Sequence, residues 1–226
     1  MPFRRSREAR LPTHLRLNGT VIELRGPAEG GVNADFVTIF LDNCYGLLDV
    51  HLPPKARVID VGANIGLFSL AARLRFSDAI IHAYEPNPRL SGFIQAHADQ
   101  AKFLCFHEAI ALRDGHVELV DRSDSNLTTT VASDGSTIPS TSFARAVDRI
   151  GGHVELLKLD CEGAEWPLLF DDAVWPSVDN VTLEYHLWAT AGVSHDDVAK
   201  RLRQLGFSIA SHVREETTGT LRARRL

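Results

Sequence analysis

The chain alternates short runs of β-branched and apolar residues with longer segments of helical periodicity. Because strands that alternate with helices pair as a parallel sheet covered on both faces, this pattern predicts an α/β fold with a doubly wound, mostly parallel sheet. The expected strands cover residues 56–62, 79–86, 103–112, 154–160 and 180–188, and the helices between them are expected at 65–75, 88–100, 142–150 and 164–172.

The C-terminal segment breaks this alternation. Ser194 and Asp197 have the spacing of a capping box, so a helix is expected over 194–206. Two strand patterns, at 207–213 and 220–226, follow with only a turn between them. This arrangement predicts an antiparallel hairpin at the end of the chain rather than another crossover.

The length of the chain favours a single domain. At 226 residues it can bury one sizeable core, whereas two full domains would each be small. Residues 1–50 contain strand-like patterns at 20–26 and 35–43. We expect this segment to form a cap or edge strands within the same domain as residues 51–226.

Charge and cysteine content exclude several classes of protein. The formal net charge of -5 gives no reason to expect nucleic acid as a partner, because binding phosphates needs a basic surface. The three cysteines are an odd number without metal-ligand spacing, which favours a reducing compartment over a disulfide framework. No stretch approaches the roughly 18 continuous apolar residues of a membrane span, and the N-terminus lacks the apolar core of a secretory signal. We therefore expect a cytoplasmic location.

The first strand of the alternating pattern ends in an acid and a glycine-rich turn, Asp60-Val61-Gly62-Ala63-Asn64-Ile65-Gly66. Gly62 and Gly66 permit a sharp turn and close approach of the backbone to a ligand, and Asn64 can cap the helix that follows. Dinucleotide sites favour glycine where Asn64 stands, and the Asp60 carboxylate would repel a diphosphate. That carboxylate suits an ammonium group, such as the one in S-adenosylmethionine. We therefore expect Asp60, Gly62, Ala63, Asn64 and Gly66 to bind this cofactor.

The next two strands also end in acids. Glu85, followed by Pro86, comes 25 positions after Asp60, which is the separation of neighbouring strands in a βαβ unit, and it can accept both hydroxyls of a ribose. Glu108, followed by Ala109, is a candidate partner for the adenine amino group or a solvated strand end. Because NAD would use Glu85 in the same way, an NAD-dependent oxidoreductase stays open as an alternative.

Four polar residues mark the ends of the fourth and fifth strands. Asp160 and Glu162 follow one strand, while Glu184 and His186 lie two apart on the other and so share a face. His186 is the candidate general base because the ordinary pKa of histidine is near neutrality, with Asp160 or Glu184 orienting its ring. Glu162 is expected to reach the acceptor or the cofactor. Asp160 borders both the cofactor and the acceptor in this arrangement.

The same strand ends also suit a metal ion. Asp160, Glu184 and His186 could together hold a divalent ion that lowers the pKa of an acceptor hydroxyl. Carboxylate ligands favour Mg or Mn, although histidine is less usual in a pure Mg site. A third alternative is a binding module that holds the cofactor without catalysis.

Five motifs in register carry a resemblance to a known family. VIDVGANIGLFSL, YEPNP, ALRDG, LKLDCEGAE and LEYH, in this order and spacing, resemble the FkbM family of S-adenosylmethionine-dependent methyltransferases over roughly residues 35–210. The resemblance implies the Rossmann-like class I methyltransferase fold, a seven-stranded sheet with a C-terminal antiparallel hairpin. It also implies O-methylation of a hydroxyl on a sugar, a polyketide or another small-molecule acceptor, which could be a glycan.

Two features depart from the family pattern. Ser142-Phe143-Ala144 stands where a Thr-Leu-Asp segment is expected, so any role of that aspartate is absent. The segment 123–142 is rich in serine and threonine and has no clear counterpart in the family. It lies where such enzymes often contact their acceptor, so the sequence leaves the acceptor open, together with O- versus N-methylation and the oligomeric state.

Overall fold

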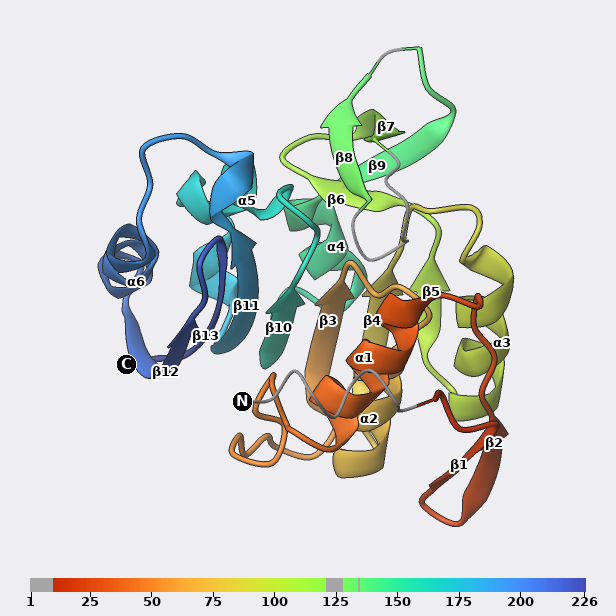
Figure 1. Cartoon of the computed structure of the whole chain (residues 1–226). Helices are drawn as coiled ribbons and strands as arrows, with labels where there is room; N and C mark the ends of the chain where they lie inside the picture. The colour runs from red at the N-terminus through yellow and green to blue at the C-terminus, as the bar shows by residue number, and fades with distance from the viewer. Residues whose placement is uncertain (1–9, 121–127, 134) are drawn as a thin grey trace.

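The computed structural model describes residues 10–120, 128–133 and 135–226. Its centre is a seven-stranded sheet in the order β12-β13-β11-β10-β3-β4-β5 (Figure 1). The pairs among β11, β10, β3, β4 and β5 are parallel, and β13 is antiparallel to both of its neighbours. This confirms the predicted α/β class, the mostly parallel sheet and the C-terminal antiparallel hairpin. The strands are β3 (Arg57–Val61), β4 (Ile80–Tyr84), β5 (Leu104–Phe106), β10 (Leu156–Leu159), β11 (Asn180–His186), β12 (Phe207–Arg214) and β13 (Thr218–Arg225).

Helices cover both faces of this sheet. Val58 of β3 belongs to one buried apolar cluster and its neighbour Ile59 to another, because successive side chains of a strand point to opposite faces. The Val58 cluster includes α1 (Gly30–Phe40), α2 (Leu67–Arg75) and α3 (Ser91–Ala101), and the Ile59 cluster includes α4 (Phe143–Arg149), α5 (Glu165–Phe170) and α6 (His195–Gln204). Short 3-10 turns lie at Trp175–Ser177 and Leu187–Ala189.

A second sheet lies beyond β5 and differs from the expected single third strand. Residues 103–112 are divided between β5 and β6 (Ala109–Ala111), and β6 leaves the central sheet to pair with β9 (Ile138–Ser142). The division falls at His107 and Glu108, where Glu108 forms an ion pair with Arg149 of α4. With β7 (Gly115–Val120) and β8 (Thr129–Ala132) these strands form a four-stranded sheet that contains the described part of the segment rich in serine and threonine.

The N-terminal region differs from the prediction in one element. Residues 20–26 include the expected strand, β2 (Thr20–Glu23), which pairs with β1 (His14–Leu17). Residues 35–43, which were expected to be a strand, belong largely to helix α1. Val32, Phe36, Ile39 and Phe40 all contact the Val58 cluster, and their spacing is helical. Within the described ranges, no helix has the length and apolar character needed to cross a bilayer.

The register of the parallel strands sets the position of the site. Lys158 of β10 pairs with Asp60 of β3, and Leu159 pairs with both Val61 and Leu183. The residues that follow these strands therefore meet at one edge of the sheet, which is where open α/β sheets bind their ligands.

Candidate active site

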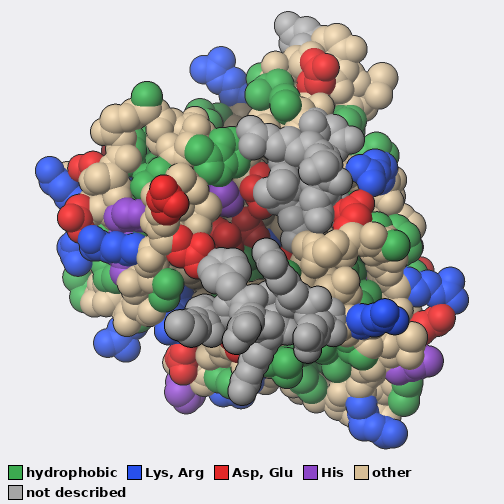
Figure 2. All heavy atoms as spheres, in the orientation of Figure 1, with side chains coloured by type: hydrophobic (Ala, Val, Ile, Leu, Met, Phe, Trp, Pro, Cys, Tyr) green, Lys and Arg blue, Asp and Glu red, His purple; other side chains and the backbone are tan. Residues whose placement is uncertain are grey.

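A cavity of about 400 Å³ lies at the carboxyl ends of β3, β4, β10 and β11. Its walls also include residues of α1, of the loop that follows α1, and of the second sheet. This volume is within the range of small-molecule and cofactor sites. Figure 2 shows acidic side chains deep in the hollow between the two halves of the molecule.

The glycine turn forms one wall of the cavity. Gly62 has φ +71°, and a Cβ placed there would lie 1.7 Å from the backbone oxygen of Asp160. Gly62, Ala63 and Asn64 all line the cavity. Asn64 does not form the predicted helix cap, because the N-cap of α2 is Gly66, and the backbone N–H of Asn64 donates to Glu85. Gly66 lies against Phe103 and does not line the cavity. Only the first part of the predicted turn therefore faces a ligand.

Asp60 does not reach the cavity surface. Its side chain is fully buried, accepts a hydrogen bond from the Ser69 hydroxyl at 2.7 Å and lies 3.3 Å from the Lys158 ammonium. Lys158 itself lines the cavity and donates to the backbone oxygen of Gly62 at 2.7 Å. The direct contact with a cofactor ammonium that was predicted for Asp60 is not supported, because a lysine already neutralises this carboxylate.

Glu85 lines the cavity, and two backbone N–H groups fix the position of its carboxylate. Its two oxygens accept the N–H groups of Asn64 at 2.8 Å and Asn87 at 2.9 Å. Burial raises the pKa of Glu85 to about 7, against the lowering effect of these two hydrogen bonds. Each oxygen retains acceptor capacity, so the carboxylate can still take two hydroxyl donors.

Of the three other predicted cofactor residues in this region, two line the cavity and one does not. Pro86 and Ala109 line the cavity, as expected of cofactor-contacting positions. Glu108 does not line it, since its carboxylate pairs with the Arg149 guanidinium at 2.7 Å. A contact between Glu108 and an adenine is therefore not supported by this arrangement.

Lys158, Asp160 and Glu184 meet Tyr45 at the floor of the cavity. The Tyr45 hydroxyl donates to Asp160 at 2.7 Å and lies 3.3 Å from Glu184, while the Lys158 ammonium lies 3.6 Å from Asp160. Burial and then the charges of Asp160 and Glu184 raise the pKa of Tyr45 well above its ordinary value, so its hydroxyl keeps its proton. Burial lowers the pKa of Lys158, but the charges of Asp60 and Asp160 raise it by more. This lysine stays charged.

His186 is held between two carboxylates. Its Nδ1 lies 3.1 Å from Glu165, its Nε2 lies 3.3 Å from Glu162, and its backbone N–H also donates to Glu165. Burial lowers the pKa of His186, but the hydrogen bond and charge of Glu165, with Asp160 and Glu162, raise it to about 9. His186 does not line the cavity. Because both ring nitrogens contact carboxylates and the ring does not line the cavity, this arrangement does not support His186 as the predicted general base.

Glu162 and Glu184 line the cavity, and the pKa of each carboxyl is raised. Burial, followed by the charge of Asp160, raises the pKa of each to about 8. Glu162 also has φ +53°, a left-handed backbone that glutamate rarely adopts, ahead of Gly163 at φ +96°. Such strained positions cluster at functional sites.

The side chains whose arrangement most resembles a metal site are not the predicted set. Ligand atoms of Asp160, Glu162 and His186 lie within 4.8 Å of one another, with Glu162 in place of the expected Glu184. His186 lies between Glu162 and Glu165, which favour its protonated form, and a metal ion would have to displace that proton because a metal ligand must be a neutral imidazole. These residues therefore fit a bound proton better than a resident metal ion.

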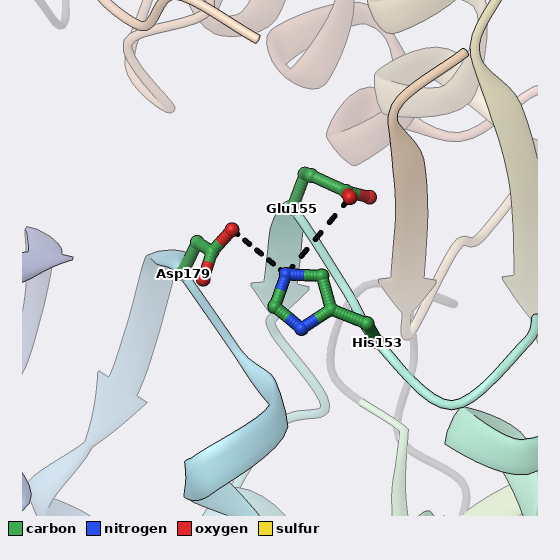
Figure 3. A group of neighbouring side chains, drawn as sticks. All are labelled: His153, Glu155 and Asp179. Carbon is green, nitrogen blue, oxygen red and sulfur yellow. Dashed lines mark hydrogen bonds and ion pairs between the residues drawn. The ribbon is translucent and has the colours of Figure 1, made fainter. Parts of the chain in front are cut away.

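A second group of this type lies at the opposite end of the sheet. The Nε2 atom of His153 lies 2.8 Å from Asp179 and 3.9 Å from Glu155. Figure 3 shows the imidazole pointing toward both carboxylates. The Glu155 carboxylate already pairs with the Arg57 guanidinium through both oxygens, at 2.7 and 3.1 Å. This group is therefore an ion-pair network that joins the first residues of β3 to the segments before β10 and β11.

Residues 60–209 match the Methyltransferase FkbM domain, and this match covers most of the chain. The chain belongs to the FkbM methyltransferase family. Within this family, 31-O-demethyl-FK506 methyltransferase FkbM of Streptomyces tacrolimicus is 29% identical over 214 residues, which cover 76% of this chain and 80% of the relative. Methyltransferase 1 of Beauveria bassiana is 27% identical over 177 residues, which cover 65% of this chain and 70% of the relative.

A solved structure of similar fold is magnesium protoporphyrin IX methyltransferase from Synechocystis with bound S-adenosylmethionine, at TM-score 0.51 and 15% identity, covering 89% of this chain and 86% of the other. The likeness shows the class I methyltransferase fold. The family match makes this FkbM protein a methyltransferase, and the alternative of an NAD-dependent oxidoreductase is not supported.

The cavity of this FkbM protein also contains residues that the sequence did not indicate. Tyr45 and the α1 residues Asp35 and Thr38 line it, although all precede the glycine turn. No motif marks Tyr45, because its partners lie more than a hundred residues later in the chain. Glu165, the first residue of α5, is fully buried against His186, which gives it a structural role beside the cavity.

Proposed function

We propose that the protein transfers a methyl group from S-adenosylmethionine to a hydroxyl of a small-molecule acceptor. The observation that carries this proposal is the Glu85 carboxylate, fixed by two backbone N–H groups in the wall of a 400 Å³ cavity beside the glycine turn. An acid at this place in a βαβ unit suits the two hydroxyls of a ribose. The relative from Streptomyces, by its name, methylates 31-O-demethyl-FK506, which supports an oxygen acceptor.

The cofactor would lie along the first two strand ends. Glu85 would accept the ribose hydroxyls, and the backbone of Gly62, Ala63 and Asn64 would lie against the rest of the molecule. Pro86 and Ala109 line the same wall. The bound cofactor supplies an activated methyl group on a sulfonium, so the protein has only to align the acceptor and remove its proton.

Glu162 is the proposed general base. In the transfer an oxygen lone pair of the acceptor forms the new O–CH₃ bond, the S–CH₃ bond breaks with its electron pair left on sulfur, and the hydroxyl proton moves to Glu162. A carboxyl whose pKa is near 8 is a stronger base than an ordinary glutamate once it is ionised, so turnover should rise with pH toward about 8. His186 and Glu165 act as positioning residues that fix Glu162 through the contacts at 3.3 and 3.1 Å.

No step in this proposal passes through a metal ion. Asp160, Glu162 and His186 come together around a proton, so the proposed transfer does not depend on Mg or Mn. We expect turnover to be unchanged within a factor of about two after removal of divalent ions with EDTA. Loss of turnover on chelation, restored by Mn, would contradict this part of the proposal.

Labelled methyl transfer tests the function directly. The purified protein is titrated with S-adenosylmethionine and, separately, with NAD, and is then incubated with methyl-labelled cofactor and fractionated small-molecule extracts. We expect binding of S-adenosylmethionine alone and a labelled product whose methyl is on oxygen. A label on nitrogen would exclude O-methylation, and binding without any labelled product would favour a module that holds the cofactor without catalysis.

Glu162→Gln tests the proposed base with that acceptor. We expect turnover to fall by about 100-fold or more, the scale of a lost general base, with cofactor affinity unchanged within a few-fold. The matched control is Glu118→Gln on strand β7, which is exposed and does not line the cavity. Unchanged turnover in Glu162→Gln would remove this residue from the chemistry.

Location and partners stay predictions of the sequence. A cytoplasmic protein that acts on a small molecule or a glycan, without nucleic acid, is consistent with the family and with the acidic cavity.

A further inference from the structure

Lys158 is a buried lysine whose ammonium group joins the ends of strands β3 and β10. Its side chain is 4% exposed, and it donates to the backbone oxygen of Gly62 at 2.7 Å and to that of Val61 at 3.3 Å. The same ammonium lies 3.3 Å from Asp60 and 3.6 Å from Asp160. An ammonium has three protons, so these four acceptors leave Lys158 without a donor for a ligand. Its contribution to the site is therefore the arrangement of its neighbours.

Two of these neighbours form part of the cavity wall. Gly62 and Asp160 both line it, and the backbone N–H of Asp160 donates to Val61 at 3.2 Å. The Asp160 side chain keeps 21% of its surface exposed, so a ligand in the cavity can reach it. Its Oδ2 atom accepts the Tyr45 hydroxyl at 2.7 Å and faces the Lys158 ammonium. Tyr45 and Lys158 therefore both hold this carboxylate in place.

The order of the strands indicates which end of the cofactor lies at Asp160. Glu85, the proposed partner of the ribose, follows β4, and the strand order on its two sides is β10-β3 and β5. On the β5 side the cavity wall contains Pro86, Ala109 and Ile110, an apolar surface that suits adenine. On the β10 side it contains Asp160, a carboxylate that suits an ammonium group. The amino-acid end of the cofactor would therefore extend over β3 and β10.

We propose that Lys158 is a positioning residue for the amino-acid end of S-adenosylmethionine. Its ammonium holds the Gly62 carbonyl and the Asp160 carboxylate in one arrangement, and the cofactor ammonium then meets a carboxylate whose place is already fixed. Such preorganisation increases affinity, because binding no longer has to order these groups. This inference rests on the proposed function and adds a residue that acts through its neighbours rather than by touching the cofactor.

Two ligands separate this role from a general effect on the fold. S-adenosylhomocysteine and 5′-methylthioadenosine share adenine, ribose and a thioether sulfur, but only the first carries the amino-acid portion. Calorimetric titration of the unaltered protein should show a preference of at least about tenfold for S-adenosylhomocysteine, the scale of one hydrogen bond to a charged group.

The test variant is Asp60→Asn/Lys158→Met, because Lys158→Met alone would leave Asp60 buried without a counter-ion. We expect its preference for S-adenosylhomocysteine to fall below about threefold, while its affinity for 5′-methylthioadenosine changes by less than about threefold. The matched control is Asp60→Asn, which keeps Lys158 beside Gly62 and Asp160 and should retain the preference of the unaltered protein. Asp60→Asn/Lys158→Gln keeps a neutral donor at position 158, and it replaces the methionine variant, with the same expectation, if circular dichroism shows that variant to be unfolded.

The outcomes separate this inference from the proposed function. A double variant that keeps the full preference, even with both affinities lowered, would show that Lys158 acts only on the fold and would overturn the proposal. Equal binding of the two ligands by the unaltered protein, or loss of the preference in Asp60→Asn alone, would overturn it as well. Failure of the unaltered protein to bind either ligand counts instead against the proposed function.

Discussion

At the scale of single residues, Gly62 leaves almost no room for a side chain. Its Cβ would overlap the backbone oxygen of Asp160, and its φ of +71° is unfavourable for other residues. We expect Gly62→Ala to destabilise the fold by roughly 2–4 kcal/mol and to weaken S-adenosylmethionine binding at least tenfold, because strand β10 and the turn must separate. Urea unfolding and calorimetric titration measure the two effects.

The control for this prediction is another glycine. Gly92 lies within helix α3, where a Cβ would meet nothing within 4 Å. Gly92→Ala should leave cofactor binding unchanged and raise stability by roughly 0.5–1 kcal/mol, because alanine favours the helix. Equal effects of the two substitutions would show that the turn does not need glycine at position 62.

Glu85 should make cofactor binding depend on pH. The pKa of this carboxyl in the free protein is about 7, and ribose hydroxyls that donate to it favour the ionised form. The bound state therefore has the lower pKa, so affinity should rise with pH up to about 7 and level off above it. We expect affinity to fall several-fold between pH 7.5 and pH 6. In Glu85→Gln, which does not titrate, affinity should be weaker but lack this component, and an identical pH profile in both proteins would exclude the assigned role.

The positions of the site residues were predictable, but their roles were not. Asp160, Glu162 and Glu184 reach the cavity because parallel strands end at one edge, which alternation of elements already implies. Asp60 and His186 were assigned direct roles from the same pattern. Their partners, Lys158 and Glu165, neutralise them in the folded chain, and spacing along a sequence does not show which oppositely charged groups will meet.

At the scale of elements, Glu165 joins helix α5 to strand β11 through His186. The pKa of His186 is raised above its ordinary value, so this contact stabilises the fold in full below about pH 6.5 and loses its effect as pH rises through about 9. Glu162 and Asp160 face the same ring and share in the shift. We expect Glu165→Gln to lower the unfolding free energy by roughly 3 kcal/mol at pH 6 and by clearly less at pH 9.5.

Urea unfolding at the two pH values checks this difference. Asp172→Asn is the matched control, because Asp172 is an exposed acid just after α5 that pairs with Arg201. It should change stability by less than about 1 kcal/mol at either pH. A loss of stability in Glu165→Gln that is the same at both pH values would mean that the carboxylate does not act through the charge of His186.

The elements were predictable wherever one periodicity dominated. Helix α6 was marked by its capping box, and both hydrogen bonds of that box are present between Ser194 and Asp197. Helix α1 was missed because Val37, Thr38 and Ile39 are β-branched, a local preference for strand that the packing of Val32 and Phe40 at helical spacing overrides. The division between β5 and β6 falls at Glu108, which pairs with Arg149, a contact that no local pattern shows.

At the scale of the whole molecule, the N-terminal region completes the cavity. Tyr45 lies 115 residues before Asp160 in the chain and donates to it at 2.7 Å. Such long-range contacts cannot be derived from local patterns, since they depend on how the finished sheet presents both segments. The prediction that residues 1–50 belong to the same domain as residues 51–226 follows from length alone and needs a test of cooperativity.

Tryptophan fluorescence provides that test, because Trp166, Trp175 and Trp188 all lie in the C-terminal half of the chain. Ile22 of β2 is 1% exposed within the Val58 cluster, and its neighbour Val21 is 51% exposed. Truncating a buried isoleucine removes about 3 kcal/mol. If the chain unfolds as one unit, Ile22→Ala should shift the fluorescence and circular dichroism transitions by this same amount, while Val21→Ala shifts neither by more than about 0.5 kcal/mol. A fluorescence transition that stays in place in Ile22→Ala would show that the N-terminal region unfolds separately, and Tyr45 would then be able to leave the cavity without unfolding the sheet.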